Sequence, residues 1–264
     1  MANRAVQSSN SLFRTLGLLS LAWGFDPRRL KLIAKLPRFV REYRAFRRAG
    51  GVVQSLFPIF SDYDDQAGQM SGHYFHQDLL VAKFIYDANP RRHIDVGSRI
   101  DGFVAHVATF REIELADIRP LRATQYSQIK FFQADLMQPQ AALEGIADSV
   151  SSLHALEHFG LGRYGDPINP QGHVIGFRNV ARLVEPGGKL YIGLPIGRAT
   201  AVFFNGLRIM DPAEPPTWFE DPTAFALERF DYVDDAGDLH TEADATAPLG
   251  LVHGCGIYTF KRLR

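Results

Sequence analysis

The sequence contains very little cysteine, with Cys255 as the only one among 264 residues. A disulfide within the chain is therefore excluded, and a reducing compartment fits best, so we expect a cytoplasmic protein. A single cysteine is more typical of a small buried apolar side chain than of a nucleophile. With 46% apolar and 22% charged residues, the composition is that of an ordinary globular protein.

Long apolar runs are also missing. The stretch LFRTLGLLSLAWGF is interrupted by Arg14 and is shorter than the roughly 20 apolar residues that a membrane-spanning helix needs. It lacks a small-residue cleavage site, which argues against a secretory signal peptide. We therefore predict neither a membrane span nor a cleaved leader here.

Charge is distributed unevenly, although the net charge is zero. Residues 1–51 hold 11 of the 29 basic residues and only two of the 29 acidic ones, Asp26 and Glu42. The rest of the chain is acidic, with 18 basic against 27 acidic residues. An acidic body without a recognisable reading motif argues against nucleic-acid binding. We predict a basic helical segment over residues 1–71 and an α/β domain over 72–264.

The basic segment contains an amphipathic pattern in RRLKLIAKLPRFVREYRAFRR, where Pro37 is expected to kink or divide the helix. Its apolar residues recur at helical spacing with arginines between them: Leu32, Ile33, Leu36, Phe39, Val40, Tyr43 and Phe46. Two interpretations stay open. The helix packs on the body, which we favour, or it lies on anionic lipid at the inner face of the membrane.

From residue 72 onward, helical and strand patterns alternate in the order that a parallel sheet requires. A helix over YFHQDLLVAKFIYDANP ends near Asn89-Pro90. Strands are predicted within residues 93–97, 111–120, 130–138, 148–156 and 189–195, with helices at 102–110 and 176–184. The run EPGG breaks the chain before the fifth strand, and residues 225–235 and 254–264 form an antiparallel hairpin. The sequence predicts a mostly parallel seven-stranded sheet with helices on both faces.

Unusual residues follow four of the predicted strands. They are the loop from Gly97 to Gly102, Asp117, Asp135 and the stretch HALEHFGLGRYGDP. Ligands of open α/β sheets bind outside the carboxyl ends of the strands, where the strand order switches direction. The agreement between four strands predicts one ligand site at that edge.

These elements resemble the class I S-adenosylmethionine-dependent methyltransferases. The resemblance covers residues 72–264 and rests on DVGS, ADIRP, QADL, DSVSSLHALEH and LVEPGGKLYIGLP. YFHQD, DVGSRIDGF, DIRPL and HFGLGRYGDP are more closely similar to an uncharacterised family, domain of unknown function 268, which often accompanies surface-polysaccharide genes. The resemblance implies a Rossmann-like methyltransferase fold, S-adenosylmethionine as cofactor and S-adenosylhomocysteine as product.

Cofactor-binding residues are carried over from the resemblance by position. Asp95 would hold the cofactor's ammonium group, Asp117 both ribose hydroxyls, with Glu114 as the less favoured register, and Asp135 the adenine amino group. The full set is Asp95, Gly97, Ser98, Arg99, Gly102, Asp117, Ile118, Asp135, Leu136 and His154.

The glycine loop departs from the family pattern. Arg99 and Asp101 stand where the second and third glycines are usual, although Gly102 can serve as the third if the loop holds one extra residue. Two roles stay open for Arg99: contact with the cofactor carboxylate or an acidic substrate, or a place on the surface of a rearranged loop. On its glycines alone the motif is weak.

The methyl acceptor is expected to be a small molecule or a glycan-linked group. His158 is the natural general base because histidine titrates near neutrality, and the alternative is a structural role. Catalytic candidates are Glu157, His158, Tyr164 and Asp166, and substrate-binding candidates are Arg163, Asn205 and Arg208. Arg163 and Asp166 could instead pair with each other. Tyr74, His76 and Gln77 in GHYFHQD are expected to fold over the cofactor as a lid, and the alternative is that this segment only caps the next helix through Asp78.

Three rival interpretations remain. His154, Glu157 and His158 spell the H-x-x-E-H motif of inverted zinc proteases, but His154 ends an apolar strand, so we predict no metal. A nicotinamide dehydrogenase would need G-x-G-x-x-G, which is absent. The serious rival is a methyltransferase-like protein that has lost turnover and acts as a binding or scaffold subunit in surface-polysaccharide synthesis.

Overall fold

The computed structural model describes residues 27–64, 67–122 and 125–264. The chain divides into two compact units, Met1–Gln69 and Met70–Arg264, which are described separately. Within the described residues, no helix combines the length and apolarity needed to cross a bilayer.

The first unit contains a basic helix that begins at the expected proline. A 3-10 helix η1 (Pro27–Lys35) leads into α2 (Leu36–Arg48), and a short 3-10 turn η2 (Ser61–Asp64) follows. Pro37 lies in the first turn of α2, where a missing N–H is tolerated, so the predicted run is divided there. None of the residues of α2 is fully buried.

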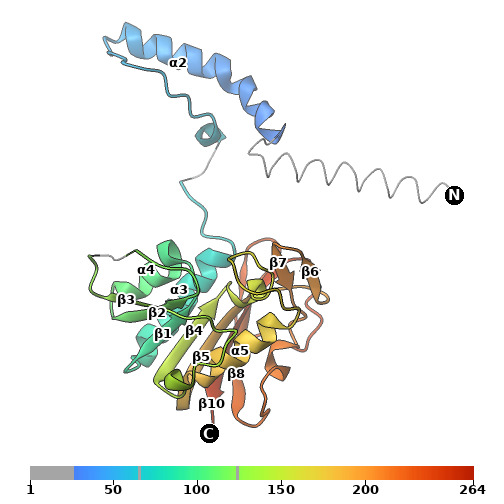
Figure 1. Cartoon of the computed structure of the whole chain (residues 1–264). Helices are drawn as coiled ribbons and strands as arrows, with labels where there is room; N and C mark the ends of the chain where they lie inside the picture. Colours follow the sequence, from blue (N-terminus) through green and yellow to red (C-terminus); the bar gives the residue numbers. More distant parts are fainter. Residues whose placement is uncertain (1–26, 65–66, 123–124) are drawn as a thin grey trace, which may run out of the picture. The chain divides into compact units, whose positions relative to one another are not determined.

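The second unit is built on an eight-stranded sheet in the order β3-β2-β1-β4-β5-β10-β8-β9 (Figure 1). Its strands are β1 (His93–Val96), β2 (Ile113–Asp117), β3 (Ile129–Gln133), β4 (Ala147–Leu153), β5 (Val184–Ile196), β8 (Phe225–Val233), β9 (Leu239–His240) and β10 (Gly254–Arg262). The first five strands are parallel, and β10 runs antiparallel to β5 and β8. The predicted architecture is confirmed, with one added strand because Leu239 and His240 pair with the end of β8.

The fifth strand differs from the prediction at its start. Strand β5 begins at Val184, and EPGG lies inside it rather than before it. Val184 pairs with Ala147 and Lys189 pairs with Ser149, so the four intervening residues bulge out of the register. A bulge of this kind keeps the ladder while it absorbs a Pro-Gly-Gly run.

Helices cover the two faces of the sheet with separate hydrophobic cores. Helix α3 (His73–Ala88), the π-turn η3 (Ile100–Val104) and α4 (Ala105–Ala108) bury Val81, Ile85 and Phe103 on one face. Helix α5 (Gly172–Arg182) buries Phe177 and Val180 on the other, together with Trp218 and Phe219. This three-layer arrangement places the loops after β1, β2, β3 and β4 at one edge.

A small ribbon extends the loop after β5. Strands β6 (Ala201–Phe203) and β7 (Leu207–Ile209) form an antiparallel pair that the sequence did not predict. Asn205 lies in the turn between them. Beside the ribbon, the order switches direction between β1 and β4, which is where α/β sheets bind ligands.

Candidate functional site

Two adjoining cavities lie at the carboxyl ends of the parallel strands. The narrower one, of about 60 Å³, runs along the ends of β1, β2 and β3 and the loop after β4. The larger one, of about 460 Å³, is bounded by the start of α3, the glycine loop and the loop after β4. Both are lined by Gly97, Asp117, Arg119, His154, His158 and Tyr164. The predicted convergence of four strand ends therefore produces a continuous hollow.

The glycine loop turns immediately after β1. Gly97 has φ +71°, and a Cβ there would stand 3.0 Å from the Cβ of Ala155, so only glycine fits without a shift. Ser98 fastens the loop to the sheet, because its Oγ accepts the N–H of Leu153 at 3.0 Å and donates to Asp95 at 2.6 Å. Gly97 and Ser98 both face the larger cavity, as expected for a cofactor loop.

Asp95 does not line either cavity, which differs from the prediction. Its carboxylate is fully buried and accepts hydrogen bonds from the backbone N–H and hydroxyl of Ser98 and from the hydroxyl of Ser151. Burial raises the pKa of Asp95 to about 6, although these hydrogen bonds oppose the rise. Asp95 therefore organises the loop instead of facing an ammonium group.

The loop's second half also departs from the family pattern. Gly102 lies in the buried π-turn, where an added Cβ would collide with the carboxylate of Asp78, so Gly102 serves packing and lines neither cavity. Arg99 lines the larger cavity, donates to Asp101 at 2.9 Å and places its guanidinium 4.9 Å from the ring centre of Tyr74. Of these two residues, Arg99 therefore lies at the site and Gly102 does not.

Asp117 ends β2 and faces both cavities. Its carboxylate accepts the backbone N–H of Arg119 at 2.8 Å and two guanidinium N–H groups of that residue at 3.0 and 2.7 Å. The same guanidinium lies 4.2 Å from the ring centre of Tyr164. Glu114, the alternative register, is bound by Arg92 at 2.6 Å and lines neither cavity. The favoured register, with Asp117 at the strand end, is therefore the one that reaches the cavity.

The third strand contributes an acid to the narrow cavity. Asp135 is half-buried, and one of its oxygens accepts the N–H of Met137 at 2.9 Å. Ile118 and Leu136 line the same cavity beside it. A mostly apolar slot with the Asp135 carboxylate beside Ile118 and Leu136 suits a flat heteroaromatic group that carries an amino donor.

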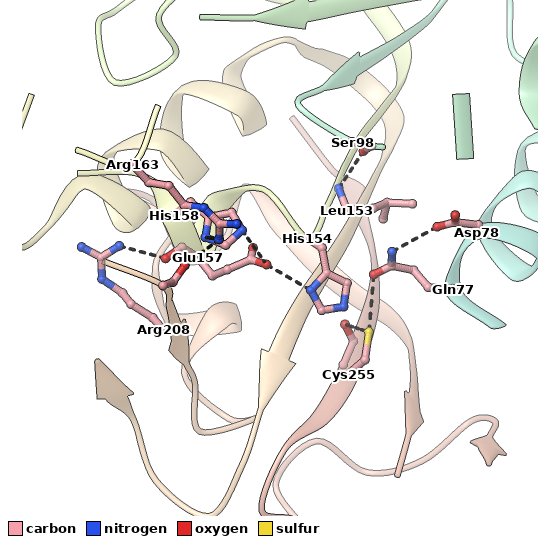
Figure 2. A network of polar contacts seen from close by, with 12 residues as sticks. Gln77, Asp78, Ser98, Leu153, His154, Glu157, His158, Arg163, Arg208 and Cys255 are labelled. Atoms are coloured by element: carbon pink, nitrogen blue, oxygen red, sulfur yellow. Dashed lines mark hydrogen bonds and ion pairs between the residues drawn. The ribbon is translucent and has the colours of Figure 1, made fainter. Parts of the chain in front are cut away.

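The loop after β4 holds a buried carboxylate between two imidazoles (Figure 2). Glu157 is 1% exposed, and its Oε1 lies 3.0 Å from Nδ1 of His154 and 3.6 Å from Nε2 of His158. His154 has φ +51°, which is uncommon for a residue with a side chain and marks a constrained position at the strand end. Glu157 therefore lines the larger cavity with little exposure and positions both imidazoles.

The two imidazoles have opposite pKa shifts. Burial lowers the pKa of His158, and the carboxylate of Glu157 opposes that shift only in part. For His154, burial acts in the same direction, but the Cys255 sulfur and the Glu157 carboxylate outweigh it and raise the pKa. His158 is therefore a neutral imidazole near pH 7, which can accept a proton.

Two polar residues of the same loop, Asp166 and Arg163, have separate partners. Asp166 accepts the backbone N–H groups of Gly160, Gly162 and Tyr164 at 2.7, 3.2 and 3.1 Å, so its carboxylate shapes the loop. Arg163 does not pair with it; one N–H donates to the carbonyl of Gly206 at 2.9 Å. Arg163 and Tyr164 both line the larger cavity.

The substrate candidates on the β6–β7 ribbon lie away from the cavities. Arg208 is 2% exposed and donates to four backbone carbonyls, so it supports the loop rather than reaching a ligand. These carbonyls belong to Glu157, Phe159, Asn169 and Pro170. Asn205 is exposed in the turn. Of the two predicted ribbon residues, neither lines the hollow.

The expected lid is only partly formed. Tyr74 lines the larger cavity, whereas Gln77 is fully buried beside Asp78 and Cys255 (Figure 2). His76 lines neither cavity. Helix α3 begins at His73, so these residues belong to its first turns.

The zinc-protease interpretation requires a helix that carries both histidines on one face. Here His154 follows the end of β4, and only residues Leu156–His158 form a short 3-10 turn. Both imidazoles are turned toward Glu157 instead of toward a shared metal position. The motif match therefore lacks the geometry of that site.

Three polar residues of the cavity walls, Arg119, His73 and His253, were not among the predicted site residues. Arg119, within the ADIRP stretch, binds Asp117 and lines both cavities. His73 and His253 line the larger cavity, and their rings lie 5.2 Å apart. The position of Arg119, two residues past an acid at a strand end, was a usable signal; His253 became a neighbour only through the antiparallel β10.

Comparisons with known families and curated proteins give one match. A family model described as "Caenorhabditis protein of unknown function, DUF268" matches residues 105–217, which is less than half of the chain. A search of curated proteins found no match. The predicted resemblance to that family is thus confirmed over the segment from α4 to the loop before β8.

Similar solved structures include several methyltransferases. The N-methyltransferase NodS from Bradyrhizobium japonicum, in complex with S-adenosylhomocysteine, is 13% identical, with 73% of this chain and 89% of that chain covered and a TM-score of 0.50. A Burkholderia thailandensis 1,6-didemethyltoxoflavin-N1-methyltransferase is 13% identical (91% and 92% covered, TM-score 0.48). A TehB-like S-adenosylmethionine-dependent methyltransferase from Corynebacterium glutamicum is 16% identical (87% and 98%, TM-score 0.46). At 13% identity, the likeness to NodS, with its TM-score of 0.50, is one of fold alone.

Proposed function

We propose that this chain, with its class I methyltransferase-like fold, binds S-adenosylmethionine and transfers its methyl group, leaving S-adenosylhomocysteine. The observation that carries the proposal is the meeting of Gly97, Asp117 and Asp135, from three successive strand ends, along one cavity. The acceptor is a small molecule or a glycan-linked group in the larger cavity. Surface-polysaccharide synthesis is a setting in which such an acceptor would occur.

The donors and acceptors along the hollow fit the parts of this cofactor. Gly97 and Ser98 would hold the amino-acid end, Asp117 the ribose hydroxyls, and Asp135 with Ile118 the adenine ring. Arg119 already donates to Asp117, so the ribose hydroxyls would have to replace guanidinium N–H groups at that carboxylate. Because the narrow cavity holds only about 60 Å³, displacement of Arg119 would also have to widen it.

The cofactor supplies an electrophilic methyl group, and this chain's residues would supply orientation and a base. His158 lines both cavities and is neutral near pH 7 because burial lowers its pKa. Its Nε2 faces Glu157 and its Nδ1 lies 3.5 Å from Arg163, on the side of the larger cavity. We assign to Nδ1 the removal of the acceptor's proton and to Glu157 the positioning of the ring.

Calorimetric titration with S-adenosylhomocysteine tests the proposal, with NAD as the control ligand. A micromolar dissociation constant, about −8 kcal/mol, is expected for S-adenosylhomocysteine and no heat for NAD. Asp117→Asn should weaken binding, whereas Asp87→Asn on the exposed face of α3 should not. Absence of binding both to the folded wild-type protein and to folded Arg119→Gln would refute the proposal.

A second candidate is a binding or scaffold protein without turnover. It is favoured by the Arg119 guanidinium, which already satisfies the carboxylate that the ribose would need. This candidate predicts no binding of S-adenosylhomocysteine even in Arg119→Gln. Restored binding in that variant would instead support a methyltransferase site that Arg119 keeps closed.

A further inference from the structure

The larger cavity has one cation whose charge the surrounding residues leave uncompensated. Three arginines line it. Arg119 is bound to Asp117, and Arg99 is bound to Asp101. Arg163 forms no ion pair in the part of the chain that the structure describes, and one of its N–H groups donates to the carbonyl of Gly206.

The remaining polar groups of this cavity do not offset that charge. Apart from Asp117, the acid on its wall is Glu157, which is buried behind His154 and His158. His73 is neutral at pH 7 because burial lowers its pKa to about 4, so it offers hydrogen bonds rather than charge. A guanidinium has five N–H donors in a planar fork, which leaves several for a ligand.

We propose that the methyl acceptor carries a carboxylate or a phosphate group, and that Arg163 binds it in the larger cavity. This inference rests on the proposed function, because the acceptor must lie beside His158. The distance of 3.5 Å between Nη1 of Arg163 and Nδ1 of His158 places the anion site next to the proposed base. An anion held there would orient a neighbouring hydroxyl toward the imidazole.

Binding of matched sugars to the full chain tests this proposal. Glucuronate and glucose 6-phosphate carry the two anions, and glucose is the uncharged comparison; each is titrated with and without S-adenosylhomocysteine. At least one anionic sugar should bind about tenfold more tightly than glucose. The two arms distinguish a carboxylate site from a phosphate site. Equal binding of all three, or binding of none, would overturn the proposal.

Arginine variants locate the anion. Arg163→Gln should weaken the anionic sugar about tenfold while the affinity for S-adenosylhomocysteine stays the same. Arg198→Gln is the matched control, because Arg198 is also exposed and donates to one backbone carbonyl, that of Gly250, outside both cavities. Unchanged sugar binding in Arg163→Gln would overturn the assignment. Failure of S-adenosylhomocysteine to bind would refute the proposed function, whereas sugar binding without it would still report on Arg163.

A second inference concerns the first unit and rests on a separate observation. Helix α2 buries no residue, and Leu36, Val40, Arg41 and Arg44 line an open groove along it with Arg48 at its end. Phe46 is 56% exposed on the same helix. Further exposed apolar side chains follow in the next segment: Val52, Leu56, Phe57 and Ile59. Exposed apolar residues in this number mark a contact surface.

The positive charge of α2 indicates a negatively charged partner. Helix α2 contains five arginines and one acid, Glu42, which Arg38 and Tyr63 already bind at 2.8 and 2.7 Å. A helix with arginines beside an apolar row matches a surface of negatively charged lipid headgroups. We infer that α2 lies on anionic lipid, with its apolar residues in the headgroup layer.

Vesicle co-sedimentation of the full chain tests the lipid surface. The chain should sediment with vesicles that contain phosphatidylglycerol, should remain in solution with phosphatidylcholine alone, and should be released by high salt. The triple variant Arg41→Gln, Arg44→Gln and Arg48→Gln should lose binding about tenfold or more. The matched triple Lys83→Gln, Arg91→Gln and Arg198→Gln in the second unit should keep it. No binding, or an equal loss in both triples, would overturn the inference and leave a protein partner as the alternative.

Discussion

Four acids at the carboxyl edge of the sheet, Asp95, Asp117, Asp135 and Asp166, use their carboxylates differently. Asp117 and Asp135 each reach the cavity wall. Asp95 accepts three hydrogen bonds from Ser98 and Ser151, and Asp166, which also lines the narrow cavity, accepts three from the backbone of its loop. An acid is therefore assigned by its partners and not by its place at the wall. Asp166 accepts three backbone N–H groups and holds its loop, whereas Asp117 and Asp135 each accept one and keep oxygens that a ligand can reach.

Loss of the proposed base should have the largest effect. His158→Gln should lower the turnover number about 100-fold or more, because proton removal by a positioned base contributes that much. The affinity for S-adenosylhomocysteine should change little. Product formation and calorimetry on the same preparation check this, and a parallel loss of cofactor affinity would show that His158 is structural.

Asp166, which holds the loop after β4, should affect stability and not turnover. Asp166→Ala removes the acceptor of three backbone N–H groups, so the free energy of unfolding should fall by about 3 kcal/mol. Urea unfolding followed by circular dichroism measures it. Asp221→Ala is the comparison, because that exposed carboxylate accepts hydrogen bonds from Thr223 on the surface. Equal stability of Asp166→Ala and wild type would show that Asp166 does not hold its loop.

Asp95 should make the free energy of unfolding depend on pH. Its pKa is raised to about 6 by burial, above the value of about 3.9 in an unfolded chain, so the folded state binds the proton more tightly. The stability that this proton contributes is present below about pH 4 and is lost as the pH rises through 6. Relative to Asp95→Asn, wild type should lose about 2–3 kcal/mol between these pH values. Parallel pH profiles of the two proteins would contradict this.

Removal of the Arg119 guanidinium from the Asp117 carboxylate should have the smallest effect on cofactor affinity. Arg119 is exposed and bonded to a partly exposed carboxylate, and pairs of this kind contribute at most about 1 kcal/mol. Arg119→Gln should therefore bind S-adenosylhomocysteine about threefold more tightly. Calorimetry checks the change, and a weaker affinity would show that Arg119 itself contacts the cofactor.

The sequence predicted the sheet well because its signals are local. Buried strands, the glycine after β1 and the Asn-Pro end of α3 each depend on a few neighbouring residues. The partners of polar side chains depend on distant segments instead. Arg208 supports a loop some 40 to 50 positions away, and the larger cavity needs His253 from the loop before the last strand, so neither role could be predicted from spacing.

The most direct test of the account is a titration of Asp117→Asn and Asp166→Ala with S-adenosylhomocysteine at a temperature where both are folded. We predict that Asp117→Asn loses about 100-fold in affinity at unchanged unfolding free energy, since a charged hydrogen-bond acceptor for two hydroxyls is removed. Asp166→Ala should lose stability and keep most of its affinity. Wild-type affinity in Asp117→Asn would contradict the assignment of the ribose site, and with it the proposed function.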